Sequence, residues 1–285
     1  MATRPLILVS ALAVLGSAVP PRAPAQTARE AMVRKSDIIF VGTVMRVGAV
    51  AAPDLAASPL TAIVRVDQVL EKPDAVGLVE GDSVTVQAGR QNSLKGGMRA
   101  TFYTTGWIFG DGVAVREVGH EPIPAQFTSA LAMQQDSVAR ARQRVNDANL
   151  LARIRAASVV AVGRVEEVRP ATLAAAPGHP TRITEHDPEW QEAIIQVQDS
   201  IKGVRSGQRV VVRFPGSRDV AYVSTPRLVV GQEGTFLLHK DTATGSPFTM
   251  MAGQSVPAYT ALNQLDVLPK QDGDRVRVLM RRKRP

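Results

Sequence analysis

The chain has no cysteine among its 285 residues, and aromatic residues make up only 4% of it. The absence of thiols excludes disulfides, cysteine-based metal sites, a cysteine nucleophile and a lipid-modified N-terminal cysteine. Hydrophobic residues still reach 45%, so the cores must be built mainly from valine, leucine, isoleucine and alanine. A chain of this length predicts two domains.

Long apolar runs are confined to the start of the chain. Arg4 precedes an apolar run from Leu6 to Val19, which is short for a membrane-spanning helix. Ala23-Pro24-Ala25 follows as a small-residue cleavage site, so we expect residues 1–25 to be a signal peptide, the alternative being an uncleaved anchor. No later stretch is apolar enough to span a bilayer. The mature protein is therefore expected in the periplasm or outside the cell.

The positive charge is concentrated at the C-terminal end. The formal net charge is +8, but residues 270–285 hold seven basic residues against two acidic ones. The remainder of the mature chain is close to neutral, which disfavours nucleic-acid binding. A weak electrostatic contact with an anionic membrane surface is one hypothesis for the tail, and a solubilising end is the other. The candidate contact residues are Arg281, Arg282, Lys283 and Arg284.

An internal repeat organises the sequence. The segment 36–44 returns 121 residues later as 157–165, and Gly42 and Gly163 hold the same place in the two copies. Each copy is a short apolar run typical of a buried strand, and a glycine inside it indicates a bulge or a close backbone approach. Later segments repeat in the same order, which predicts two similar domains of about 100 residues each. The further matches are 62–66 with 193–197, 81–86 with 207–212, and 97–102 with 231–236.

Helical patterns precede both repeats. Thr27 and Glu30 form a capping box ahead of the first strand, and apolar residues spaced by seven predict helix over about 128–156, with a possible break at Asn146-Asp147. After the second repeat, 265–268 and 276–280 are expected to add short strands. The predicted layout is a signal peptide at 1–25, a first repeat at 26–125, a helical linker at 126–156, a second repeat at 157–269 and a basic tail at 270–285.

The predicted fold class is mainly β, with two tandem five-stranded OB-like β-barrels that are each preceded by a helix. The opening strands 36–44 and 157–165 resemble the first strand of netrin-like OB-fold domains, which include the tissue inhibitors of metalloproteinases. The resemblance implies a fold. Inhibitors of that family place an N-terminal cysteine on the protease zinc, and this chain has no cysteine, so their activity and residue roles are not expected here.

Enzyme motifs are scarce. The sequence has no G-x-S-x-G elbow, no phosphate-binding P-loop and no H-E-x-x-H motif. Gly81-Asp82-Ser83 resembles a serine-hydrolase block, but the repeat counterpart Gly207-Gln208-Arg209 lacks the serine, and a turn before a strand explains both copies. No catalytic residue, metal ligand set or cofactor is predicted.

Two loops carry the candidate ligand-binding residues. In OB barrels, the loops after strands one and four flank the ligand face. The loop after the first strand is ten residues longer in the second repeat, and the turn after the fourth strand of the first repeat holds two aromatics. These aromatics stack on a ligand or, alternatively, cap the barrel core. The candidates are Trp107, Phe109, His186, Asp187 and Trp190.

The preferred interpretation is an exported, non-enzymatic binding protein whose partner is a protein or another envelope component. One alternative is a metal-dependent or hydrolytic enzyme that uses the polar loop around His186, although adjacent acids and histidine do not converge easily on a metal. The other alternative is an oligosaccharide or nucleic-acid binder.

Overall fold

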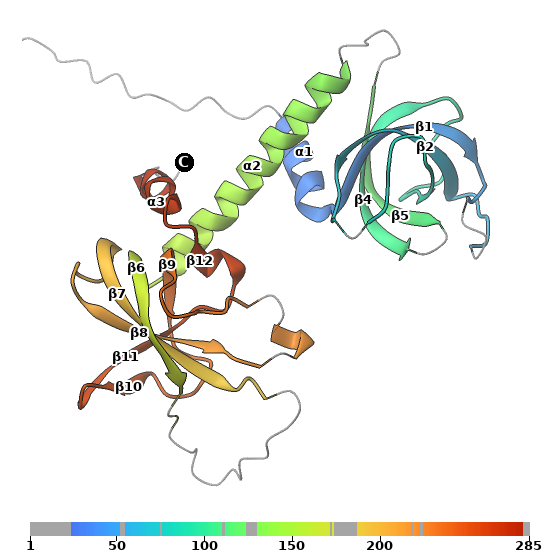
Figure 1. Ribbon diagram of the computed structural model, residues 1–285. Helices are drawn as coiled ribbons and strands as arrows, with labels where there is room; N and C mark the ends of the chain where they lie inside the picture. The colour runs from blue at the N-terminus through green and yellow to red at the C-terminus, as the bar shows by residue number, and fades with distance from the viewer. Residues whose placement is uncertain are drawn as a thin grey trace, which may run out of the picture. The chain divides into compact units, whose positions relative to one another are not determined.

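The computed structural model describes residues 24–51, 55–74, 76–109, 112–123, 130–171, 173, 187–217, 219–222 and 225–281. The chain divides into two compact units, one ending at Ala141 and the other beginning at Arg142 (Figure 1). Strands predominate over helices in both, which confirms the predicted mainly-β class. No helix in the described part of the chain is long and apolar enough to cross a membrane.

The first unit is a closed five-stranded barrel with strand order β1-β2-β3-β5-β4. All neighbouring strands are antiparallel except β3 and β5, which pair in parallel, as expected for an OB-like topology. Valine and phenylalanine side chains from these strands fill the interior together with leucines from the connecting segments, and Phe40 stacks on Phe102 at 5.3 Å between ring centres. The elements are α1 (Pro24–Lys35), β1 (Ile38–Val47), β2 (Thr61–Glu71), β3 (Ser83–Gln87), β4 (Arg99–Phe109) and β5 (Val113–Pro122).

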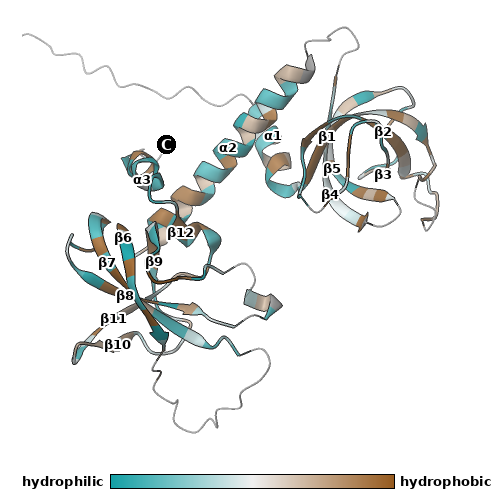
Figure 2. Ribbon diagram, in the orientation of Figure 1, coloured by the Kyte–Doolittle hydropathy of each residue, from teal (hydrophilic) through white to brown (hydrophobic). Residues whose placement is uncertain are grey.

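The second unit repeats this ring. β11 pairs in parallel with β8 and antiparallel with β9, which completes the order β6-β7-β8-β11-β9. β10 and β12 extend the sheet beyond the ring, and polar and apolar residues mix along its strands (Figure 2). The elements are β6 (Val159–Pro170), β7 (Trp190–Lys202), β8 (Arg209–Pro215), η1 (Val220–Tyr222), β9 (Glu233–Lys240), β10 (Phe248–Met251), β11 (Gln254–Thr260), η2 (Gln264–Asp266), β12 (Val267–Leu268) and α3 (Asp272–Arg281).

The helix α2 (Ala130–Ala156) connects the two barrels in the chain, and the boundary between the units falls within it. It runs without the interruption that the sequence suggested at Asn146-Asp147. Its C-terminal carbonyls have a cationic partner, because Lys202 Nζ donates to the carbonyl oxygens of Ile154 and Arg155 at 3.3 and 3.1 Å.

The duplication extends to the irregularities of the strands. β1 shows three register shifts against β2, and β6 shows three against β7 at the same places in the repeat. Glycine is required at one of them, because a Cβ on Gly163 would lie 2.6 Å from the carbonyl oxygen of Gln196. A Cβ on Gly42 would likewise lie 2.8 Å from the carbonyl oxygen of Arg65. Equal bulges in both copies indicate one ancestral barrel.

Both ends of the described chain differ from the sequence-based expectation. α1 begins at Pro24, so Thr27 lies inside the helix and does not cap it. The predicted strand at 276–280 is part of α3, because Val276 and Leu279 are three residues apart and both bury against the second unit. The helical spacing of these two side chains outweighs the β-branched composition.

Candidate functional site

The aromatic candidates of the first unit lie on a strand, not in a loop. β4 continues to Phe109, which pairs with Val113 across the end of the β4–β5 hairpin. Trp107 is half-buried, and the guanidinium of Arg116 on β5 lies 5.2 Å from its ring centre. This cation–π contact covers one face of the ring, so Trp107 is already partnered within its own barrel.

The loop candidates of the second unit are only partly described. Trp190 is the first residue of β7 and is half-buried, and Asp187 precedes it by three residues. His186 lies outside the described residues. Within the described ranges, no group of three or more histidine, aspartate or glutamate side chains could hold a metal ion. Trp107 and Trp190 belong to separate units, and nothing places them in one site.

The basic C-terminal end is partly folded. Arg275 pairs with Asp147 at 2.8 Å, and Lys270 pairs with Glu233 at 3.0 Å. Hydrogen bonds from Gln198 and Lys270 lower the pKa of Glu233. Arg281 is exposed at the end of α3, whereas Arg282, Lys283 and Arg284 lie outside the described residues. Part of the predicted basic tail is therefore neutralised by carboxylates on α2 and β9.

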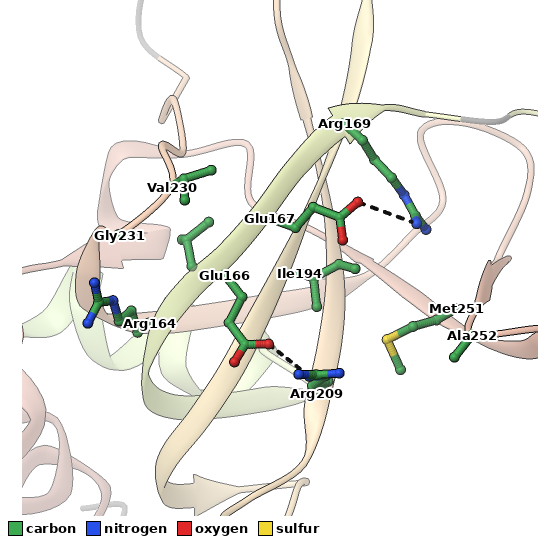
Figure 3. A pocket seen from close by; sticks show the side chains of 11 residues that line it. Arg164, Glu166, Glu167, Arg169, Ile194, Arg209, Val230, Gly231, Met251 and Ala252 are labelled. Carbon is green, nitrogen blue, oxygen red and sulfur yellow. Dashed lines mark ion pairs between the residues drawn. The ribbon is translucent and has the colours of Figure 1, made fainter.

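A hollow of about 640 Å³ opens on the outside of the second barrel, on strands β6, β7 and β8 (Figure 3). We call this surface the β6–β8 face. Ile194 forms part of its floor, while Met251 and the exposed Val230 form its walls. A second hollow of about 420 Å³ shares Met251 and Arg209 with it. Met251, the last residue of β10, thus lines both depressions.

Paired charges surround the larger hollow. Arg209 Nε lies 2.8 Å from a carboxylate oxygen of Glu166, and Arg169 lies 3.8 Å from Glu167. Figure 3 shows Ile194 in the space between these two ion pairs. Arg164 adds a further positive charge to the lining. The face therefore offers an apolar floor with both signs of charge at its rim.

A buried ionic network lies further along the same face of β7 and β8, where β10 covers it. Arg213 is fully buried in β8; its Nε donates to Glu192 at 3.1 Å and its NH1 donates to Asp241 at 2.8 Å. Asp241 is buried as well, and Arg169 makes a second contact to Glu192 at 3.2 Å. Thr249 also donates to Glu192 at 2.7 Å. Two arginines balance two carboxylates, which makes the burial of these charges tolerable.

The same arginines fasten β10 to the barrel. The two-residue turn at 252–253 places Phe248 and Met250 at positions that point their backbone groups away from β11. Their carbonyl oxygens accept hydrogen bonds from Arg213 at 3.1 Å and from Arg169 at 2.7 Å. The outer edge of β10 is therefore capped by guanidinium groups and is a poor template for a further strand.

Sequence reasoning missed this network. A signal was present, since Arg213 interrupts an apolar run from Val210 to Phe214 in a predicted strand. A charge in such a run is expected to have a buried partner. The partners, Glu192 and Asp241, lie 21 and 28 residues away in the chain, so local patterns did not identify them.

The first unit has its own polar cluster at β4, β5 and α1. Glu121 accepts a hydrogen bond from Tyr103 at 2.8 Å and pairs with Arg29 at 2.9 Å. Burial and the Glu121 carboxylate together raise the pKa of Tyr103. Burial opposes ionisation of Glu117, but hydrogen bonds from His120 and from a backbone amide outweigh burial and lower the pKa of Glu117. The Arg29–Glu121 pair connects α1 to the barrel.

Comparison with known proteins assigns no family. No protein-family model matches the chain, and no curated protein matches it. Among solved structures, it aligns with a deletion mutant of the single-stranded DNA binding protein from Thermus aquaticus, with 12% identity over 79% of this chain and 91% of that chain. The TM-score is 0.15, so the alignment supports no argument about fold or function. The class of the molecule rests on its own strand order, that of OB-like barrels.

Proposed function

We propose that this chain is an exported, non-enzymatic binding protein that holds a protein or another envelope component on the β6–β8 face. The observation that carries the proposal is the hollow on this face, which combines an apolar floor with charged side chains of both signs. Exposed apolar side chains lie beside it, among them Val229, Val230 and Met250, each more than half exposed. Clustered exposed apolar residues with a polar rim are typical of interaction surfaces.

The rim charges support a protein partner over a nucleic acid. Three arginines in the lining are accompanied by Glu166 and Glu167, which would repel phosphates. A groove that tracks a nucleic-acid backbone carries an excess of positive charge. Here each acid already pairs with an arginine, so the electrostatic attraction to a polyanion is weak.

Export rests on the sequence pattern of residues 1–25. The charged start, the short apolar run and the small-residue site before Gln26 support signal cleavage. An envelope location also agrees with the absence of cysteine, because the barrels have no thiol that an oxidising compartment could oxidise. The partner would be met outside the cytoplasm.

Site-specific photo-crosslinking in the producing organism tests the proposed function. The full-length protein carries a photoreactive residue at Val230, on the wall of the hollow, or at Asp274, which is exposed on α3. We expect a discrete crosslinked adduct from position 230 and none from position 274. The absence of any adduct from either position, or equal adducts from both, would contradict binding on the β6–β8 face.

A further inference from the structure

We infer that the partner presents an extended peptide segment to the β6–β8 face, with an aliphatic side chain flanked by one acidic and one basic side chain. The inference rests on the proposed function and specifies the partner of the same site. Its main determinants on this chain are the Glu166–Arg209 ion pair and the apolar surface of Ile194 and Met251.

Comparison of the two repeats shows that the five-stranded ring closes without the Glu166–Arg209 ion pair. The first unit keeps the bulges and the turn glycines of the second, so both copies meet the same folding requirements. At the positions that match the charged lining, however, no residue of the first unit carries the same charge. Arg169 has a structural role through Glu192 and β10, but closing the ring gives no reason for the Glu166–Arg209 ion pair. The matched positions are Thr43 for Arg164, Met45 for Glu166, Arg46 for Glu167, Gly48 for Arg169 and Ser83 for Arg209.

The ion pair can change partners at little cost. The side chains of Glu166 and Arg209 are 37% and 57% exposed, so water already screens the attraction between them. Exposed pairs of this kind contribute little to stability. An incoming basic side chain can therefore take Glu166 while an acidic one takes Arg209. Glu166 and Arg209 would then each pair with an oppositely charged side chain of the peptide, so the face is complementary to a segment that carries both charges.

The floor between the charges suits an aliphatic side chain. Ile194 is nearly buried, and its exposed part faces the hollow beside Met251 (Figure 3). Methionine is flexible and adapts to different apolar shapes. Val230 closes the opposite side with a side chain that is mostly exposed and would lose water on binding.

The structure disfavours strand addition as the mode of binding. At the sheet edge next to the hollow, an added strand would need the outer backbone groups of β10, but the carbonyls of Phe248 and Met250 already accept hydrogen bonds from Arg213 and Arg169. The segment must then be recognised through its side chains in the hollow. This distinguishes the inferred mode from backbone pairing at a sheet edge.

A charge-swap experiment tests the inference. The full-length protein is panned against phage-displayed random dodecapeptides, and the binders are measured by fluorescence anisotropy. Three variants are compared: Glu166→Lys, Arg209→Glu and the double swap. We expect enriched peptides to combine an aliphatic residue with both charges and to bind each single variant about tenfold more weakly.

The double swap separates recognition from stability. It keeps an ion pair on the barrel, so its melting temperature should stay near that of the parent protein, yet it reverses the charges offered to the peptide. Peptides selected on the parent protein should bind the double swap more weakly. Peptides in which the acidic and basic residues are exchanged should bind the double swap with recovered affinity. Equal binding of one peptide to the parent and to the double swap would overturn the inference, as would a library without binders that depend on these residues. If either of these results is found while position 230 still gives a crosslinked adduct, only the inferred peptide class is refuted, and the proposed function stands.

Discussion

Replacing the buried arginine of β8 is the strongest test of how the second barrel is held together. In Arg213→Met the side chain keeps much of its length, but Glu192 and Asp241 lose their shared cation. Removing one member of a buried ionic group leaves uncompensated charge and costs about 3–5 kcal/mol. Whole domains have stabilities of only about 5–15 kcal/mol, so this loss is a large fraction of the total.

Arg209→Met is the matched control, because it removes an arginine from the same strand where the side chain is 57% exposed. Its effect on stability should stay within about 0.5 kcal/mol. For a unit of this size, the Arg213→Met variant should melt roughly 6–20 °C lower than the parent. Circular dichroism follows the melting, and hydrogen-exchange mass spectrometry assigns the destabilised transition to the second unit.

Neutralising the carboxylates as well should recover part of the loss. The triple variant with Glu192→Gln and Asp241→Asn no longer buries unpaired carboxylates, and a buried neutral amide costs less than a buried unpaired charge. If Arg213→Met costs less than about 1 kcal/mol, or if the triple variant is less stable than the single one, the network does not act through charge balance.

Three further predictions concern the stability of the second barrel, the stability of the first unit at acidic pH and the N-terminus of the exported protein. Gly163→Ala should destabilise the second unit by about 1–3 kcal/mol because its Cβ meets a backbone carbonyl, whereas Gly77→Ala, with open space around it, should not; urea titration measures both. The lowered pKa of Glu117 means that its hydrogen bond with His120 stabilises the first unit fully above about pH 4.5 and that this stability is lost as the pH falls through the folded value. Glu117→Gln should therefore flatten the stability profile in acid, and an unchanged profile would refute this assignment. Intact-mass measurement of the exported protein should place its first residue near Gln26; retention of the leader would contradict the signal-peptide prediction.

The fold class followed from the sequence because its signals are local. Short segments of the chain repeat the same signals: glycines that indicate turns, apolar runs that indicate strands, and a glycine within a strand that indicates a bulge. None of these signals depends on distant residues. The predicted mainly-β class was therefore confirmed, with one closed five-stranded barrel and a second sheet of seven strands. The strand pairing extends the correspondence to the fifth strand of the ring, where Ala114 of β5 takes the place that Ala258 takes in β11.

Only the tertiary structure decided where the candidate site lies. The sequence favoured aromatic residues in loops as candidates, because a single aromatic can be identified without knowing its neighbours in space. It left a role in the core equally open for Trp107. The β6–β8 face depends on side chains from β6, β7, β8 and the β10–β11 turn, which become neighbours only when the ring closes. Burial of Arg213 likewise depends on carboxylates from two other segments. Charge pairing and apolar floors of this kind are long-range properties, so a local pattern can mark a buried charge such as Arg213 but cannot identify its partners.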